Sequence, residues 1–359
     1  MSDLAATIAR RIRRDGPLSI AAFMAMALHD RDSGYYARRN PLGAAGDFIT
    51  APEISQIFGE LIGLWCADCW RHMGSPDAVI LAELGPGSGA LMEDCLRAAA
   101  TVPEFRRALR LHLVEASPLL RATQQRRLGD AEPHFVSDIG QLPEGPLLLI
   151  ANEFLDALPI RQLVRGRVEW RERLVMLDDA GRLVFADGPE SAAASLLVPE
   201  ERRAAAPGTV IEICPPAAAL AATLGSRLAQ HPGALLFVDY GYCTAIPGST
   251  LAAVRCHQTA GILDDPGGAD LSAHVDFAAF AAAAGAAGAI THGPVAQGRF
   301  LTALGAEARL AALAARATPA QRADLKNGLQ RLIEPAQMGN LFKALALNSP
   351  GLPAPAGFE

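Results

Sequence analysis

The sequence predicts an α/β fold built around an open, mostly parallel sheet. Two observations lead to this prediction. From residue 78 onward, short apolar runs alternate with helical segments, a pattern typical of βαβ units. The first apolar run, 78–84, is followed by a glycine-rich turn at 85–89 and then by a helical pattern from Ala90. This order lets a ligand approach bare backbone, because a Cβ at the glycine positions would block it.

The composition is that of a globular protein and disfavours several function classes. Of the 359 residues, 50% are apolar and 19% are charged, and the formal net charge is −6. Basic residues occur only in runs of two or three, which argues against a nucleic-acid partner. No apolar stretch approaches the roughly 20 residues that span a bilayer. The first residues lack the apolar core of a signal peptide. We therefore expect a cytoplasmic protein without a membrane span.

The cysteines predict no metal site. Cys66 and Cys69 form a C-x-x-C pair, but no second pair and no histidines follow at metal-ligand spacing. We expect the six cysteines to be reduced thiols, most of them buried.

Residues 1–75 predict a helical region. Apolar residues recur every four positions over 4–12, Ser19 can cap a second helix, and a long helix covers 53–72 until Gly74 ends it. We expect this region to pack on the ligand site, with the loop that precedes the long helix as a lid or wall.

Seven strands are expected in the core of the protein. Five of them lie at 78–84, 111–115, 134–138, 147–153 and 234–240, and the last two at 290–295 and 342–347. Helices are expected at about 274–287 and 303–333. The core would therefore comprise residues 76–159 and 209–350.

Residues 160–208 interrupt this pattern. Between the fourth and fifth strands apolar and polar residues alternate, as they do over 168–175. Such alternation predicts a half-exposed antiparallel insertion rather than another βαβ crossover.

Polar residues follow the predicted strands at their carboxyl ends, where open α/β sheets bind ligands. They are Glu83, Glu115, Asp138, Asn152-Glu153 and Asp239-Tyr240. A carboxylate about 20–30 residues beyond the glycines can accept both hydroxyls of a ribose, which assigns that role to Glu115. Asp138 would then meet an adenine amino group. Together, the polar residues at these strand ends favour a nucleoside ligand.

The glycine turn narrows the choice of nucleoside cofactor. Its glycines, Gly85, Gly87 and Gly89, alternate after Glu83 in an E-x-G-x-G-x-G pattern. The third glycine falls one residue early for the dinucleotide pattern G-x-G-x-x-G, and no Gly-Lys-Ser/Thr follows. The pattern is the form used by class I methyltransferases that bind S-adenosyl-L-methionine (SAM). A nicotinamide enzyme with an altered turn is the alternative. A serine hydrolase is disfavoured because Ser88 is not at the centre of a G-x-S-x-G elbow.

Nearly the whole chain resembles the MidA-like SAM-dependent methyltransferases, a family that includes a mitochondrial assembly protein arginine methyltransferase of respiratory complex I. The resemblance is carried by His29-Asp30, Gly34-Tyr35-Tyr36, Gly46 to Glu60, Glu83 to Gly89, Leu113 to Ser117, Asn152 to Pro159, Val238 to Gly241 and Asp270 to Phe277. It departs at Ala51, where Ser is usual, and at Leu155, where Phe is common.

The resemblance implies a class I methyltransferase fold: a Rossmann-like seven-stranded sheet with a helical N-terminal extension and an antiparallel insertion between strands 4 and 5. It implies SAM as the cofactor and protein arginine N-methylation of a complex I core subunit, in support of assembly. In a eukaryote it implies the mitochondrial matrix. Two alternatives keep the SAM site: a methyltransferase for another protein or a small molecule, and a SAM-binding assembly chaperone with little turnover. The oligomeric state is not predicted.

The expected site has two sets of residues. Those expected to hold the cofactor are Asp47, Thr50, Gln56, Glu83, Gly85, Gly87, Gly89, Glu115, Asp138 and Asn152. Those expected to act on the acceptor are Glu153, Asp156, His274 and Asp276. Carboxylates fix a guanidinium by bidentate hydrogen bonds, which favours Glu153 and Asp156. Alternatively, Asp156 caps a local turn, Asp276 caps a helix, and His274 is only a satisfied polar contact.

Overall fold

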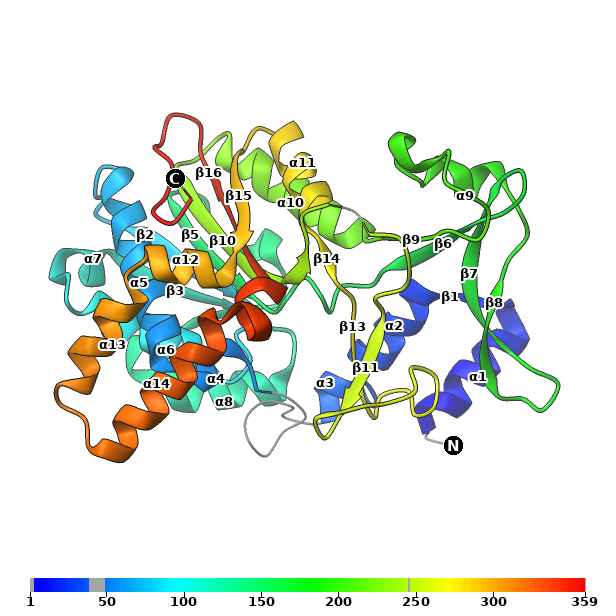
Figure 1. Cartoon of the computed structure of the whole chain (residues 1–359), viewed down its shortest axis with the longest axis horizontal. Helices are drawn as coiled ribbons and strands as arrows, with labels where there is room; N and C mark the ends of the chain where they lie inside the picture. The colour runs from blue at the N-terminus through cyan, green and yellow to red at the C-terminus, as the bar shows by residue number, and fades with distance from the viewer. Residues whose placement is uncertain (1–2, 39–48, 245, 359) are drawn as a thin grey trace.

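The computed structural model describes residues 3–38, 49–244 and 246–358. Its larger part is built on a main sheet with seven strands along its path, which lies among helices in Figure 1. In spatial order the strands are β15 (Ile290–Ala296), β16 (Phe342–Asn348), β10 (Gly233–Tyr242), β5 (Leu147–Asn152), β2 (Val79–Leu84), β3 (Leu109–Val114) and β4 (His134–Val136). β16 runs antiparallel to both of its neighbours, whereas the pairs from β10 to β4 are parallel. A short strand, β14 (Val275–Asp276), extends the sheet beside the end of β10. All seven predicted core strands are present.

The chain order of the strands determines where a ligand can bind. From β2 the chain continues outward to β3 and β4, and it then returns to β5 on the other side of β2. This reversal opens a crevice at the carboxyl ends of β2 and β5, the usual ligand site of an open α/β sheet. The glycine turn follows β2, and Asn152-Glu153 ends β5, so the strand order brings these two segments together.

Helices cover both faces of the sheet because its buried residues alternate between the two faces. Val79 and Leu81 pack with one cluster, whereas Ile80 and Ala82 pack with the other. The first face is covered by α5 (Gln56–His72), α6 (Ala90–Ala99), α12 (Gln297–Ala303), α13 (Ala306–Ala314) and α14 (Pro319–Ile333). The second face is covered by α10 (Pro215–Leu228) and α11 (Phe277–Ala286). Along the chain between β2 and β5 there are also three short helices and one longer helix. They are α7 (Pro103–Ala108), η1 (Gly129–Ala131), η2 (Ile139–Gln141) and the longer α8 (Pro118–Leu128).

A second sheet is antiparallel and is made mostly by the insertion. Its strands are β1 (Leu18–Ser19), β6 (Arg161–Arg165), β7 (Trp170–Leu177), β8 (Leu183–Asp187) and β9 (Val210–Ile213). α9 (Ala192–Leu196) and η3 (Glu200–Arg202) connect β8 to β9. The insertion between the fourth and fifth strands is therefore antiparallel, as its alternating pattern predicts. The segment boundaries at 75, 159 and 209 remain a prediction, and β9 lies just past the last of them.

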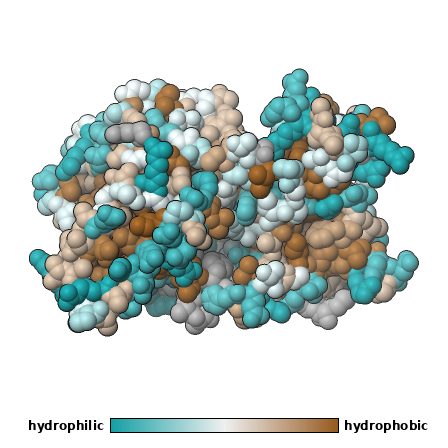
Figure 2. Space-filling view, in the orientation of Figure 1, coloured by the Kyte–Doolittle hydropathy of each residue, from teal (hydrophilic) through white to brown (hydrophobic). Residues whose placement is uncertain are grey.

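The first part of the N-terminal region, residues 3–38, packs against this second sheet, whereas α5 packs against the main sheet. β1 pairs with β7, and α1 (Asp3–Asp15), α2 (Ile20–His29) and α3 (Tyr35–Arg38) share one apolar cluster with β7 and a third small sheet. That sheet contains β11 (Ala252–Arg255), β12 (Gln258–Thr259) and β13 (Asp270–Ser272). Figure 2 shows a notch on the surface between this part and the part built on the main sheet.

Two predicted helices are interrupted in the structure. The helix expected at 53–72 is split into α4 (Ala51–Ile54) and α5, because Ser55 has an extended backbone (φ −157°) and its Oγ accepts a hydrogen bond from Ile57 N–H (3.3 Å). The helix expected at 303–333 is divided by Thr318, which caps α14 ahead of Pro319. A π-turn, η4 (Pro335–Gly339), precedes β16. Among the described residues, no helix combines the length and apolarity that a membrane span requires.

Candidate functional site

The described residues enclose a cavity of about 410 Å³ at the crevice between β2 and β5. This volume is in the range of small-molecule sites. The main-sheet part contributes the glycine turn and the ends of β3 and β5, and the N-terminal region contributes His29, Tyr36, Thr50 and Pro52. Polar or glycine residues of the lining are His29, Tyr36, Thr50, Glu83, Gly85, Gly87, Ser88, Glu115, Ser117, Ser137, Asp138, Asn152 and Glu153.

The glycine turn has a backbone that other residues rarely adopt. Gly85, Gly87 and Gly89 have φ values of 59°, 55° and 80°, in the left-handed region. A Cβ on Gly85 would lie 2.9 Å from the Phe154 ring. Gly89 is the N-cap of α6, so the free N–H groups of that helix begin at the turn. The bare turn therefore offers backbone N–H groups and the positive end of a helix to the cavity.

Glu115 is fixed by donors from α8. Ser117 N–H donates to its Oε1 (2.7 Å), and the Gln124 Nε2 donates to its Oε2 (3.1 Å). Burial raises the pKa of Glu115, although these hydrogen bonds and the nearby Arg121 charge oppose the shift. A carboxylate has about four acceptor positions, so two remain for a ligand that brings hydroxyl groups. This is the geometry that the predicted ribose role requires.

Glu83 lies at the end of β2 and is buried. Burial, with repulsion from Glu115, raises the pKa of Glu83 to about 8. Its Oε2 has no hydrogen-bond partner among the described residues. A positively charged ligand would satisfy that oxygen and lower the pKa again.

Asn152 and Glu153 end β5 at the floor of the cavity. Glu153 has a φ of 50°, a strained conformation for a residue other than glycine. Its Oε1 accepts hydrogen bonds from Ala51 N–H (3.2 Å) and from Asn152 Nδ2 (3.3 Å). Burial, with repulsion from Asp156, raises the pKa of Glu153 to about 8. The Asn152 Oδ1 is buried without a partner among the described residues. The strain and the raised pKa together make this segment a candidate functional segment.

Asp156 lies beneath the cavity rather than in its lining. The Tyr240 hydroxyl donates to its Oδ2 (2.5 Å), and its Oδ1 is buried with no partner among the described residues. Burial raises the pKa of Asp156 to about 6, although the Tyr240 hydrogen bond opposes the shift. Asp156 is therefore a second buried carboxylate beside Glu153, and it retains a free acceptor atom.

Asp239 holds the loop that carries these two carboxylates. Its Oδ2 accepts hydrogen bonds from the N–H groups of Phe154 (3.1 Å), Leu155 (2.9 Å) and Asp156 (3.2 Å). Burial and repulsion from Asp156 and Glu153 raise the pKa of Asp239, whereas the backbone donors lower it. The sequence prediction noted Asp239 at a strand end but assigned it no role. Its position, one residue beyond the Val238–Asn152 pair of β10 and β5, becomes visible only in the structure.

Other contacts of the site were missed from the sequence. His29 and Tyr36 line the cavity with their rings stacked (5.6 Å between centroids), and the Tyr36 hydroxyl donates to Asp270 Oδ1 (3.1 Å). Burial lowers the pKa of His29, so it is expected to be neutral near pH 7. The resemblance motifs contained both residues, but no spacing rule linked them to the glycine turn.

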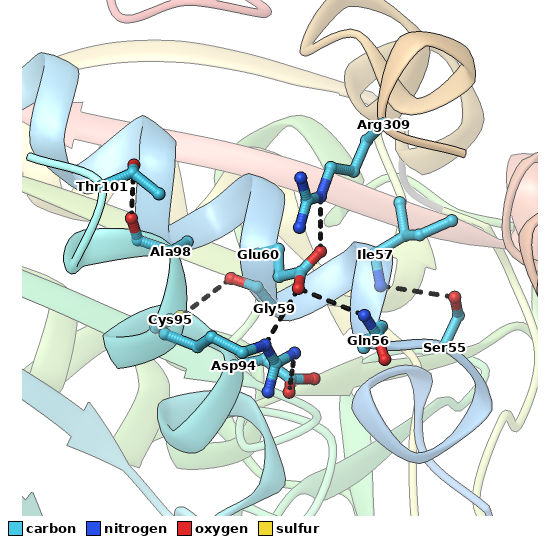
Figure 3. Close-up of polar contacts among 11 residues, drawn as sticks. Ser55, Gln56, Ile57, Gly59, Glu60, Asp94, Cys95, Ala98, Thr101 and Arg309 are labelled. Carbon is cyan, nitrogen blue, oxygen red and sulfur yellow. Dashed lines mark hydrogen bonds and ion pairs between the residues drawn. The ribbon is translucent and has the colours of Figure 1, made fainter. Parts of the chain in front are cut away.

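Besides Asp156, the predicted residues Gln56, Gly89, His274 and Asp276 do not line the cavity. Gln56 is exposed, and its Nε2 donates to Glu60 Oε1 (3.3 Å). Glu60 also pairs with Arg97 and Arg309, and Figure 3 shows Gln56 beside this ion cluster. Asp276 caps α11 through Ala279 N–H (3.0 Å) and pairs with Arg202 (2.9 Å). His274 packs edge-on against the Tyr240 ring (5.5 Å between centroids). The Asp276 geometry is therefore that of the capping alternative, whereas the contact of the His274 side chain is with an aromatic ring.

Two further predicted residues, Thr50 and Asp138, are at the cavity. Thr50 lines the cavity and is the N-cap of α4. Asp138 also lines the cavity, and its Oδ1 accepts a hydrogen bond from Gly140 N–H (2.8 Å). Asp47, the remaining predicted contact, lies outside the described residues.

The charge of the cavity suits SAM better than a dinucleotide. The described lining contains Glu83, Glu115, Asp138 and Glu153 but no lysine or arginine. A pyrophosphate would meet these carboxylates without a cationic partner, whereas a sulfonium and an ammonium group would be attracted. Among the described residues, no three His, Cys, Asp or Glu side chains are grouped as metal ligands. The residues present therefore fit SAM.

Comparisons with known proteins agree with this fit. Residues 61–295 match a family model described as an S-adenosyl-L-methionine-dependent methyltransferase. The chain is 36% identical to the mitochondrial protein arginine methyltransferase NDUFAF7 of Danio rerio, over 94% of this chain and 84% of that protein. It is 33% identical to the human protein of the same name, over 94% and 81%. A crystal structure from Burkholderia thailandensis, bound to S-adenosyl-homocysteine, has 31% identity and a TM-score of 0.85, covering 99% of this chain and 93% of the other.

Proposed function

This chain belongs to the MidA-like family of SAM-dependent methyltransferases, and we propose that it methylates an arginine side chain of a protein. The predicted fold class, cofactor and enzyme class are confirmed by the family match and the similar structures. When bound, SAM supplies a methyl group on a sulfonium, which is open to in-line attack by a nucleophile. The task of the protein is to align the acceptor and to stabilise its charge.

We propose that the cofactor is held by the residues around the glycine turn. Gly85, Gly87 and Gly89 provide a backbone without side chains, and Glu115 accepts hydrogen bonds from the ribose. The buried Glu83 Oε2 provides an acceptor for an ammonium group. Asp138 and Thr50 lie at the wall of the same cavity.

The observation that carries the arginine proposal is a group of buried oxygens that lack donors. Among the described residues, Asp156 Oδ1, Asn152 Oδ1 and Glu53 Oε2 are buried without a hydrogen-bond partner. Buried acceptors are normally satisfied, so unpaired ones beside a cavity call for a ligand rich in donors. A guanidinium carries five N–H donors and no acceptor. It would pair with these oxygens and bring the positive charge that the buried Asp156 carboxylate lacks among the described residues.

Glu153 is proposed as the group that accepts the proton of the reaction. Methylation of a guanidinium nitrogen releases one proton, which must leave the nitrogen that gains the methyl group. The Glu153 carboxyl lies at the cavity, and the charge of a bound guanidinium would lower its pKa from about 8, which provides the ionised form that a general base requires. Asp156, held by Tyr240, would orient the other guanidinium nitrogens.

The partner is proposed to be a core subunit of respiratory complex I. Support comes from the family resemblance and from relatives named as mitochondrial arginine methyltransferases. The compartment is proposed to be the mitochondrial matrix in a eukaryote and the cytoplasm otherwise.

A transfer assay tests this proposal. Purified protein and radiolabelled SAM are incubated with isolated complex I subunits, and labelled amino acids are identified after hydrolysis. We expect labelled methylarginine from the wild type. Glu153→Gln should retain cofactor affinity within about threefold, because its shape is conserved, but should lose at least about 100-fold in turnover. Undiminished turnover would remove Glu153 from the chemistry. Label on another residue type would identify a different acceptor, and no label on any subunit would favour the chaperone alternative.

A further inference from the structure

The side chain of Gln124 connects two segments that line the cofactor cavity, the glycine turn and the segment that carries Glu115. Gln124 lies on α8, and its side chain is fully buried (0% exposed). Its Nε2 donates to the Gly87 carbonyl oxygen (2.8 Å) and to Glu115 Oε2 (3.1 Å). Gly87 belongs to the turn after β2, whereas Glu115 follows β3. One amide group therefore joins the bare turn to the carboxylate.

The orientation of this amide is fixed by its partners. Both contacts are acceptors, and an amide nitrogen has two hydrogens to give. If the amide were turned over, its oxygen would face a carbonyl and a carboxylate, with no donor between them. The Gln124 Oε1 is buried and has no partner among the described residues, which is an energetic cost of this arrangement. The two hydrogen bonds that its nitrogen donates offset this cost.

The two contacts leave Glu115 ready for a ligand. Ser117 N–H and Gln124 Nε2 each occupy one position on a different carboxylate oxygen. With both oxygens anchored, the plane of the carboxylate cannot rotate, and its two remaining acceptor positions have fixed directions. Hydrogen bonds that are already oriented lose less entropy when a ligand binds.

We propose that Gln124 is a positioning residue for ribose recognition: it orients the Glu115 carboxylate and ties it to the Gly87 backbone, so that both hydroxyls of a nucleoside cofactor are bound together. The inference rests on the role of Glu115 in cofactor binding and is independent of the arginine acceptor. It assigns the discrimination between ribose and deoxyribose to a residue that need not touch the ligand.

The experiment measures binding rather than turnover. Calorimetry gives the Kd of S-adenosyl-L-homocysteine and of its 2′-deoxy and 3′-deoxy analogues for the full chain. The wild type should bind the ribose form about 10-fold or more tightly than either analogue, because a missing hydroxyl leaves a buried acceptor unpaired. In Gln124→Met, which keeps the length of the side chain but removes both donors, this ratio should fall to about threefold or less. Gln124→Glu provides a second variant of nearly identical shape.

The neighbouring exposed residue provides the matched control. Gln125→Met makes the same chemical change on the same helix and should leave the ratio at its wild-type value. Equal weakening of all three ligands in both folded Gln124 variants, with an unchanged ratio, would mean that Gln124 only supports the fold, and would overturn the proposal. A wild type without ribose preference would overturn it as well, by removing the premise about Glu115. Failure of arginine methylation alone would leave it intact.

Discussion

At the scale of single residues, the most unusual feature is the end of β5. Glu153 has a left-handed backbone, and such strain persists only where neighbouring contacts hold it. Asp239 provides them, because its carboxylate binds three successive N–H groups of the loop from Phe154 to Asp156. Asp239 is thus a structural support for Glu153 and Asp156, the two carboxylates proposed to act on the acceptor.

Replacing Asp239 by Asn tests this support. The single remaining oxygen can still face the loop, but the new amide nitrogen then faces Tyr240 N–H, a donor that now binds Asp239 Oδ1 (2.9 Å). We expect a loss of about 1–3 kcal/mol in the free energy of unfolding. Turnover should fall at least about 10-fold, with cofactor affinity changed by less than about threefold. Denaturant titration, calorimetry and a transfer assay measure these effects. Wild-type turnover in the variant would contradict the supporting role.

At the scale of elements, the turn after β2 and the start of α6 form the cofactor cradle. Gly87→Val should abolish cofactor binding, because a branched side chain would occupy the cavity that Gly87 lines, and because a φ of 55° strains any β-branched residue. Calorimetry with S-adenosyl-homocysteine measures the loss.

Gly305→Val separates the effect of strain from that of occupancy. Gly305 has a φ of 88° at the start of α13, and a Cβ there would meet nothing within 4 Å. We expect this control variant to lose stability but to bind the cofactor normally. Normal affinity in folded Gly87→Val would refute the cradle.

The helices behind the cradle are joined by an ion cluster that the sequence did not reveal. Glu60, on α5, accepts hydrogen bonds from Arg97 of α6 (3.0 Å) and Arg309 of α13 (2.6 Å), as Figure 3 shows for Arg309. Burial tends to raise the pKa of Glu60, but the two arginines lower it below its usual range. Gln56, predicted to contact the cofactor, belongs to this cluster instead. The cluster fixes the packing of α6, and therefore the position of the turn from which α6 begins.

At the scale of the whole molecule, buried carboxylates make stability depend on pH. Burial raises the pKa of Glu83 and Glu153 to about 8 in the folded chain, whereas an unfolded glutamate titrates near 4.5. Between these values the folded state binds more protons than the unfolded state. The stability of the ligand-free protein should therefore fall as pH rises from about 5 to about 8.

Thermal unfolding measured across this range tests the prediction. We expect Tm to decrease with pH in the ligand-free protein, and to decrease less in Glu83→Gln, which no longer titrates there. Saturating cofactor should raise Tm most at the upper end of the range, because it pairs with the ionised forms. A Tm that is independent of pH in the ligand-free protein would contradict the buried, protonated state of these groups.

The sequence alone determined the core strands, the glycine turn and the acidic strand ends. These are local features: apolar runs bounded by turns predict strands, and alternating glycines require a bare backbone. Because parallel strands end at one edge of a sheet, Glu83, Glu115, Asp138 and Asn152-Glu153 could be assigned to one site from the sequence. The glycine turn also indicated the cofactor, and the resemblance added the family and the acceptor.

The tertiary structure decided which segments far apart in the sequence contact one another. Only the pairing of β10 with β5 brings Asp239 under the loop of Glu153, and only the packing of α8 places Gln124 behind Gly87 and Glu115. It also assigned Gln56 to the Glu60 cluster and Asp276 to a helix cap, because a polar side chain binds the nearest available partner. Periodicity and motifs describe neighbours along the chain, whereas these contacts depend on side chains from separate elements meeting in a buried space.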